Sequence, residues 1–121
     1  MPSRYEPCGL NQLYSLRYGT VPVVRSTGGL ADTVDEFDPV SRTGNGFVFQ
    51  AFEADEMLMA MRRALAVHGE PALWRAVQRN GMAADFSWRA SADGYDHLYE
   101  EALERTGRGR VPTLETVRDS F

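Results

Sequence analysis

Residues 9–30 read GLNQLYSLRYGTVPVVRSTGGL, and the predicted class of the fold follows from this segment. Its first part predicts a helix over residues 9–18 that ends at Gly19, where a left-handed cap is usual. The apolar residues of this helix recur at three- and four-residue spacing: Leu10, Leu13, Tyr14 and Tyr18. The run VPVV at residues 21–24 then predicts a short, buried strand of a parallel sheet. A helix, a buried strand and the Gly28–Gly29 loop together form half of a doubly wound α/β unit, whose ligands bind at the carboxyl ends of the strands.

One acidic residue, Glu6, lies just ahead of this helix, between Tyr5 and Pro7. The backbone N–H groups and the dipole at a helix start favour a phosphate or a phosphorylated sugar. A lone acidic residue in this position also serves in many proteins as a helix cap. The residues alone therefore leave two roles open for Glu6, ligand binding and capping.

The remainder of the chain predicts one more strand and several helices. The strand lies at residues 46–50, after a polar loop at 35–45 that we expect to be a solvated surface excursion. Three helices follow, making the C-terminal half helix-rich: residues 54–67, a helix from Pro71 and a helix from Ser87. Residues 106–121 break the pattern and predict a flexible tail. Two strands are too few for a stable, covered parallel sheet, so we expect an incomplete α/β domain, either a fragment or a chain that needs a partner.

The helices also carry predicted buried faces. The first of the three presents five apolar residues: Met57, Leu58, Met61, Ala64 and Leu65. The second presents Leu73, Trp74 and Val77. The last carries an aromatic stripe that we expect to pack against a sheet or a neighbouring domain: Trp88, Tyr95 and Tyr99.

Composition excludes several classes of function. The chain has 121 residues, a net charge of −4 and no lysine, so we expect neither nucleic-acid binding nor a catalytic lysine. Cys8 is the only cysteine, which excludes an internal disulfide and favours a cytoplasmic location. No apolar run is long enough for a membrane span. His68 and His97 lack partners at metal-ligand or triad spacing, so we expect no metal site and no hydrolase triad.

Four segments resemble one family of enzymes. They are PSRYEPCGL at residues 2–10, TGGLADTV at 27–34, TGNGFVF at 43–49 and FSW at 86–88. These segments are similar to bacterial glycogen synthases and plant starch synthases, and the resemblance covers about residues 1–104. The family consists of retaining glycosyltransferases of the GT-B type, which have two Rossmann-like domains. The resemblance implies that residues 1–105 are the C-terminal part of the donor-binding domain, with its closing helix.

The resemblance also implies a reaction and a site. The reaction is transfer of glucose from ADP-glucose to the non-reducing end of an α-1,4-glucan with retention of configuration, without a separate cofactor. Glu6 would be the acidic residue of the donor pocket, where it holds glucose hydroxyls and stabilises charge in the transition state. The residues expected to contact the sugar and the diphosphate are Cys8, Gly9, Leu10 and Asn11. Three more residues are expected to border the same crevice: Thr27, Gly28 and Gly29.

The chain departs from the family pattern in two ways. Tyr14 occupies the position of the second glutamate of the wider E-x7-E motif, which leaves the ribose contacts unassigned. The N-terminal domain and the basic residues that bind phosphate in the family have no counterpart here, so we expect the isolated chain to be inactive. The alternative is a non-catalytic module that binds a nucleotide sugar or a glucan, or that regulates a synthase. A related transferase that uses UDP-glucose or makes sucrose is disfavoured by the EPCGL signature at residues 6–10.

Overall fold

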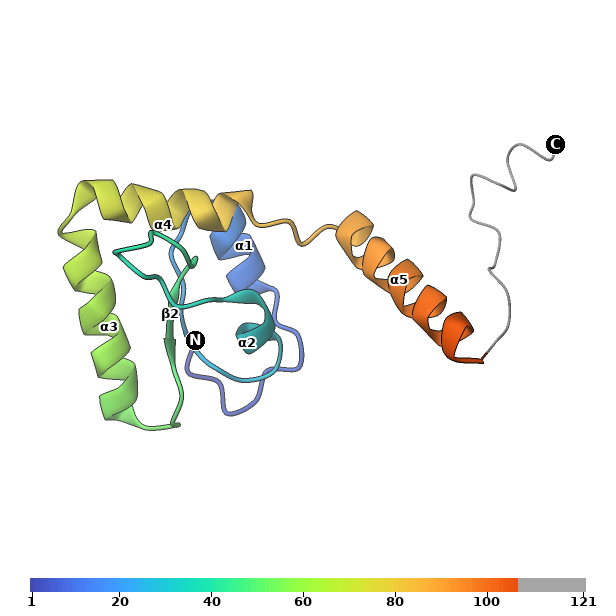
Figure 1. Cartoon of the computed structure of the whole chain (residues 1–121). Helices are drawn as coiled ribbons and strands as arrows, with labels where there is room; N and C mark the ends of the chain where they lie inside the picture. Colours follow the sequence, from blue (N-terminus) through green and yellow to red (C-terminus); the bar gives the residue numbers. More distant parts are fainter. Residues whose placement is uncertain (107–121) are drawn as a thin grey trace. The chain divides into compact units, whose positions relative to one another are not determined.

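The computed structural model describes residues 1–106, which form two compact units. The first unit, Met1–Ala84, contains both strands and four of the helices (Figure 1). The second unit begins at Asp85 and contains α5, Trp88–Thr106. The tail predicted at 106–121 lies, apart from Thr106, outside the described residues, and its flexibility stays a prediction.

The sheet has two parallel strands, as the sequence predicts. Strand β1 is Val23–Arg25 and β2 is Phe47–Phe49, with Val24 opposite Val48. Each strand is shorter than predicted, and β1 begins only after Pro22, which has no N–H to donate to a ladder. The other edge of β1 is occupied at one point by Met1. Its amino group donates to the Val23 carbonyl at 2.6 Å, and its carbonyl accepts from the Arg25 N–H at 3.1 Å.

Helices cover the two faces of this small sheet. In Figure 1, α3 lies along one side of β2, and α1 and α2 lie on the other side. The bounds are α1 Asn11–Arg17, α2 Gly29–Thr33, α3 Ala54–His68 and α4 Pro71–Ala83. Successive side chains of each strand point to opposite faces of the sheet, and this alternation creates two apolar clusters. Phe47 packs with residues of α3 and α4, and Val24 packs with Leu16 of α1 and Leu30 of α2.

The ends of the helices follow simple electrostatic and steric rules. Asp55 and Glu56 lie in the first turn of α3 and His68 in its last, which suits the helix dipole. Pro71 begins α4, where its missing N–H costs nothing. Gly19 follows α1 with φ +73°, so the predicted left-handed cap is confirmed.

The buried faces of two helices differ from the prediction. In α1 the buried residues are Gln12 and Leu16, whereas Leu10, Tyr14 and Tyr18 are exposed. In α3 the buried residues are Ala60, Ala64 and Val67, whereas Leu58, Met61 and Leu65 are exposed. The large side chains are turned away because α3 approaches the sheet through small residues. The predicted face of α4 is confirmed: Val77 is buried, and Leu73 and Trp74 pack against the same cluster.

Residues 35–45 are more than a solvated loop. Phe37 and Asn45 are buried, and the Asn45 carboxamide accepts from the Asp35 N–H at 2.8 Å and donates to the Thr33 carbonyl at 3.0 Å. At the loop's tip the Ser41 hydroxyl and the Val40 N–H donate to Asp38 and lower the pKa of its carboxyl. The loop is therefore held by specific hydrogen bonds, which the polar composition alone could not indicate.

Candidate functional site

Glu6 lies in the loop that leads into α1 and is half-buried. The Ser3 hydroxyl donates to its carboxylate at 3.3 Å. Helix α1 begins after Leu10, and none of the described side chains forms a hydrogen-bonded cap at its start. The capping role that the sequence left open for Glu6 is therefore wrong, because its carboxylate accepts from Ser3 and from none of the N–H groups of α1.

The glycine pair after β1 packs directly against this loop. The Gly29 N–H donates to the Glu6 carbonyl at 2.9 Å. A side chain on Gly28 would collide with the Glu6 carbonyl, and one on Gly29 would collide with the Cys8 carbonyl. Gly28 also has φ +47°, which glycine adopts without strain. The structure thus brings together the two predicted parts of the site, which are distant in sequence.

The other predicted residues lie around this contact. Cys8, Leu10 and Asn11 are exposed, and Gly9 is half-buried with φ +72°. The Thr27 carbonyl accepts from the Leu30 N–H at 3.2 Å, so Thr27 begins the turn into α2. The first intrahelical bond of α1 runs from the Tyr14 N–H to the Leu10 carbonyl, at 3.0 Å. The backbone donors before that point are the groups expected to meet an anion.

Arg25 also organises the loop, although no role was predicted for this residue. Its guanidinium donates to the Arg4 carbonyl at 2.7 Å, the Ser3 carbonyl at 3.3 Å and the Gln50 carbonyl at 2.9 Å. Phe52 lies under the guanidinium groups of both Arg4 and Arg25, at 5.2 and 5.8 Å. Arg25 therefore joins the Glu6 loop to the segment after β2. Its place at the carboxyl end of a buried strand was a signal that could have identified it.

Gln12 and Thr33 are two more side chains that sequence reasoning missed. The Gln12 carboxamide nitrogen lies 3.0 Å from the Cys8 carbonyl, 3.2 Å from the Gly9 carbonyl and 3.3 Å from the Thr33 hydroxyl. The Thr33 hydroxyl donates to the Gly29 carbonyl at 2.6 Å. Both side chains thus touch the backbone of predicted site residues.

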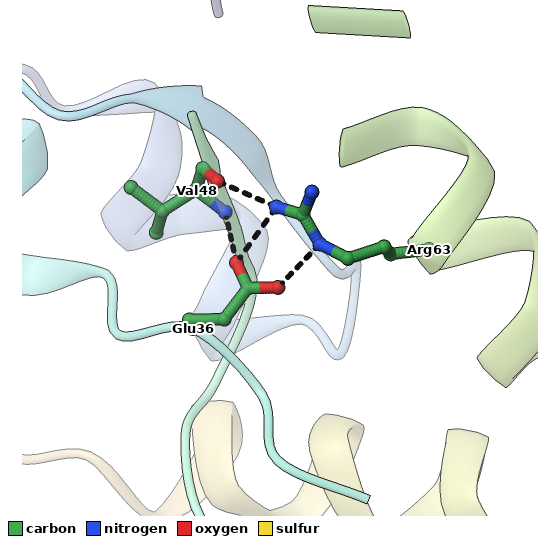
Figure 2. Close-up of polar contacts among 3 residues, drawn as sticks. All are labelled: Glu36, Val48 and Arg63. Carbon is green, nitrogen blue, oxygen red and sulfur yellow. Dashed lines mark hydrogen bonds and ion pairs between the residues drawn. The ribbon is translucent and has the colours of Figure 1, made fainter. Parts of the chain in front are cut away.

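A separate open hollow of about 490 Å³ contains none of the predicted site residues. Glu36 and Arg63, which line it, pair at 2.7 Å and also bond the backbone of Val48 (Figure 2). Because the Glu36 carboxylate and the Arg63 guanidinium already pair with each other, Arg63 is not an unpaired cation that could bind a phosphate in this hollow. The loop that carries Glu6 is therefore the better candidate site.

Two kinds of feature are absent from residues 1–106. No group of three or more His, Cys, Asp or Glu side chains in that range is placed to hold a metal ion. Within the same range, none of the helices combines the length and apolar character needed to cross a lipid bilayer.

Comparisons with known proteins agree on one family. The chain is 54% identical over 104 residues to a glycogen synthase of Koribacter versatilis, covering 86% of this chain and 22% of the relative. It is 60% identical over 99 residues to a glycogen synthase of Anaeromyxobacter, covering 82% of this chain and 21% of the relative. No protein-family model matches the chain.

A solved structure gives the same result for the fold. The catalytic domain of starch synthase IV from Arabidopsis thaliana, bound to ADP and acarbose, superposes with a TM-score of 0.69 at 38% sequence identity. The match covers 85% of this chain and 22% of that domain's chain. The chain thus spans about a fifth of the length of the relatives it matches.

Proposed function

Because the chain is a homologue of one segment of the glycogen and starch synthases, we propose that it forms part of the donor site of such an enzyme. The reaction is transfer of glucose from ADP-glucose to the non-reducing end of an α-1,4-glucan, with retention of configuration. The observation that carries the proposal is the contact between the Glu6 loop and the Gly28–Gly29 pair. It joins the two most family-specific segments of the sequence at one place.

In this proposal Glu6 supplies the negative charge of the pocket. A carboxylate beside the glucose ring holds its hydroxyl groups and favours the positive charge that develops at the anomeric carbon. The backbone N–H groups of Gly9, Leu10 and Asn11 meet the diphosphate or the sugar. Thr27, Gly28 and Gly29 border the crevice, with the glycines allowing close approach of the two backbones.

We further propose that the other parts of the active site come from a GT-B N-terminal domain and from earlier strands of the donor domain. The residues in hand contain no lysine, and Arg25 is engaged with three carbonyl groups. We propose that these parts of the enzyme also supply the cation that meets the phosphate. A cytoplasmic location fits the single cysteine and the ADP-sugar donor.

The first test concerns activity. The purified chain, incubated with ADP-glucose and a glucan primer, is expected to transfer no glucose above background. Transfer above background would refute the proposal that the remaining active-site groups lie elsewhere.

The second test concerns the donor. Calorimetric titration with ADP and ADP-glucose, on this chain and on Glu6→Ala, separates the contribution of the sugar from that of the nucleotide. We expect Glu6→Ala to weaken ADP-glucose binding by about tenfold while ADP binding is retained, the loss of one charged hydrogen bond. Equal weakening of both ligands would contradict the role of Glu6 at the sugar.

A further inference from the structure

Gln12 is an unexpected side chain at the centre of this site. It lies in α1 and is fully buried. Its carboxamide nitrogen contacts the carbonyl groups of both Cys8 and Gly9. Its carboxamide oxygen has no hydrogen-bond partner among the described residues. A buried carbonyl without a hydrogen-bond partner is unfavourable. The favourable contacts of this side chain are therefore the ones that its carboxamide nitrogen donates.

The Gln12 contacts fix the direction of two peptide groups. In a planar trans peptide the C=O and the N–H point in opposite directions. When the carbonyls of Cys8 and Gly9 turn inward to Gln12, the N–H groups of Gly9 and Leu10 turn away from the helix. Those two N–H groups are among the donors that the proposed function assigns to the diphosphate or the sugar.

Gly9 and Gln12 are also matched in shape. A Cβ atom on Gly9 would lie 2.5 Å from the Gln12 carboxamide oxygen and 2.9 Å from its nitrogen. Because Gly9 has no side chain, the Gln12 carboxamide can lie directly against the backbone of the turn. The glycine is thus required both by its positive φ and by the glutamine beneath it.

Thr33 extends the network to the second part of the site. Its hydroxyl donates to the Gly29 carbonyl and accepts from Gln12, while the Gly29 N–H donates to the Glu6 carbonyl. A continuous series of hydrogen bonds therefore runs from Cys8 and Gly9, through two side chains, back to Glu6. Such a network holds the turn in one conformation before any ligand arrives.

We propose that Gln12 and Thr33 are positioning residues that hold the Glu6–Leu10 turn so that the Gly9 and Leu10 N–H groups face the donor. This inference rests on the proposed function for the identity of the ligand. It concerns the geometry of the turn, which can be measured without any ligand.

The experiment compares Gln12→Met with a matched control, Gln78→Met. Gln78 also donates its carboxamide to a backbone carbonyl of this region, that of Gly19 at 2.7 Å, but at the opposite end of α1. We expect the backbone order parameters of the Gly9 and Leu10 amides, measured by NMR relaxation on the full chain, to fall in Gln12→Met from about 0.85, typical of a rigid backbone, to below about 0.6. The order parameters of these two amides should stay unchanged in Gln78→Met.

Thr33 supplies a second pair of variants in case Gln12→Met does not fold. Thr33→Val removes the hydroxyl at nearly constant shape, and Thr33→Ser keeps it. Lower order parameters at Gly9 and Leu10 in Thr33→Val, with the original values in Thr33→Ser, would support the proposal. Equal effects of Gln12→Met and Gln78→Met, or no difference between the two Thr33 variants, would overturn it.

Titration of the same variants with ADP-glucose separates the two proposals. We expect Gln12→Met to weaken binding by about tenfold and Gln78→Met to leave it unchanged. If the unsubstituted chain binds no ADP-glucose, the proposed donor site fails, while the order parameters still decide the positioning role. If it binds and Gln12→Met binds equally well, the positioning role fails alone.

Discussion

The glycines after β1 determine how closely the Glu6 loop can approach α2. Gly29 is buried, and its N–H donates to the Glu6 carbonyl at 2.9 Å. Any side chain at this position would meet the Cys8 backbone, which cannot move aside as a flexible side chain can. The backbone contact is therefore a packing requirement as well as a feature of the proposed site.

Gly29→Ala is expected to destabilise the first unit by about 1–3 kcal/mol, the usual cost of overpacking a close contact. Urea denaturation measures this loss, and the same variant should weaken ADP-glucose binding because the Glu6 loop must shift. Gly94→Ala is the matched control. A side chain at Gly94 in α5 meets nothing within 4 Å, so the unfolding of the first unit should stay unchanged. An unaltered midpoint in Gly29→Ala would contradict the close packing.

At the scale of single residues, the sequence indicated the backbone of the site better than its supporting side chains. Glu6 and the glycines belong to recognisable local patterns, a helix entry and a strand-to-loop turn. Gln12 and Thr33 do not, because their roles depend on α1 and α2 lying side by side. A glutamine inside a helix is normally exposed, and no periodicity in a single sequence shows that this one is buried.

At the scale of elements, β2 presents an edge that has no third strand beside it in the described sheet. Two charged side chains take the place of that strand (Figure 2). Glu36 accepts from the Val48 N–H at 2.6 Å, and Arg63 donates to the Val48 carbonyl at 2.7 Å. An exposed edge is a template for pairing with other chains, and charged groups on it oppose such pairing.

Arg63→Ala is expected to lower the free energy of unfolding by only about 1 kcal/mol, because the ion pair is partly exposed. Its main effect should be faster association of chains through β2, measured by light scattering during refolding. The control is Arg105→Ala, which breaks the Glu101–Arg105 pair on α5, where no strand edge is present. Equal scattering by the two variants would argue against a protective role for Arg63.

The elements themselves were largely predictable, and their orientation was not. Local sequence signals predicted both strands and the helices that begin at Pro71 and after Ser87. These signals are runs of β-branched residues and the residues that interrupt regular structure. On α3 the prediction of Ala64 as buried is confirmed, whereas Leu58, Met61 and Leu65 were mispredicted because these larger side chains point away from the sheet. Helix α2 was not predicted, because the sequence indicated only a loop at Gly28 and Gly29. Its five residues are held by the packing of Leu30.

At the scale of the whole molecule, both apolar clusters are built from residues before Asp85. Helix α5, considered by itself, buries none of its residues, and its predicted aromatic stripe is exposed: Trp88, Tyr95 and Tyr99. The contact between this stripe and a sheet or a neighbouring domain stays a prediction. The first unit should therefore derive its stability from its own two clusters.

A variant that ends at Ala84 tests this independence. We expect its urea midpoint and its denaturant slope to match those of the whole chain, because the slope follows the surface exposed on unfolding. Trp74 is a suitable probe, since it packs against the first cluster and its ring lies 4.8 Å from that of His68. Trp88→Phe in the whole chain makes Trp74 the sole tryptophan in both proteins.

A lower midpoint in the shortened variant would show that residues after 84 stabilise the first unit, and the stripe would then be the first surface to examine. Trp88→Phe, Tyr95→Ala and Tyr99→Ala in the whole chain would reveal whether the stripe supplies that stability. If the midpoints agree, the aromatic side chains of α5 do nothing for the fold of the first unit. Their apolar surface would then be free to bind the remainder of the enzyme, where burying each ring is worth about 1.5–3 kcal/mol.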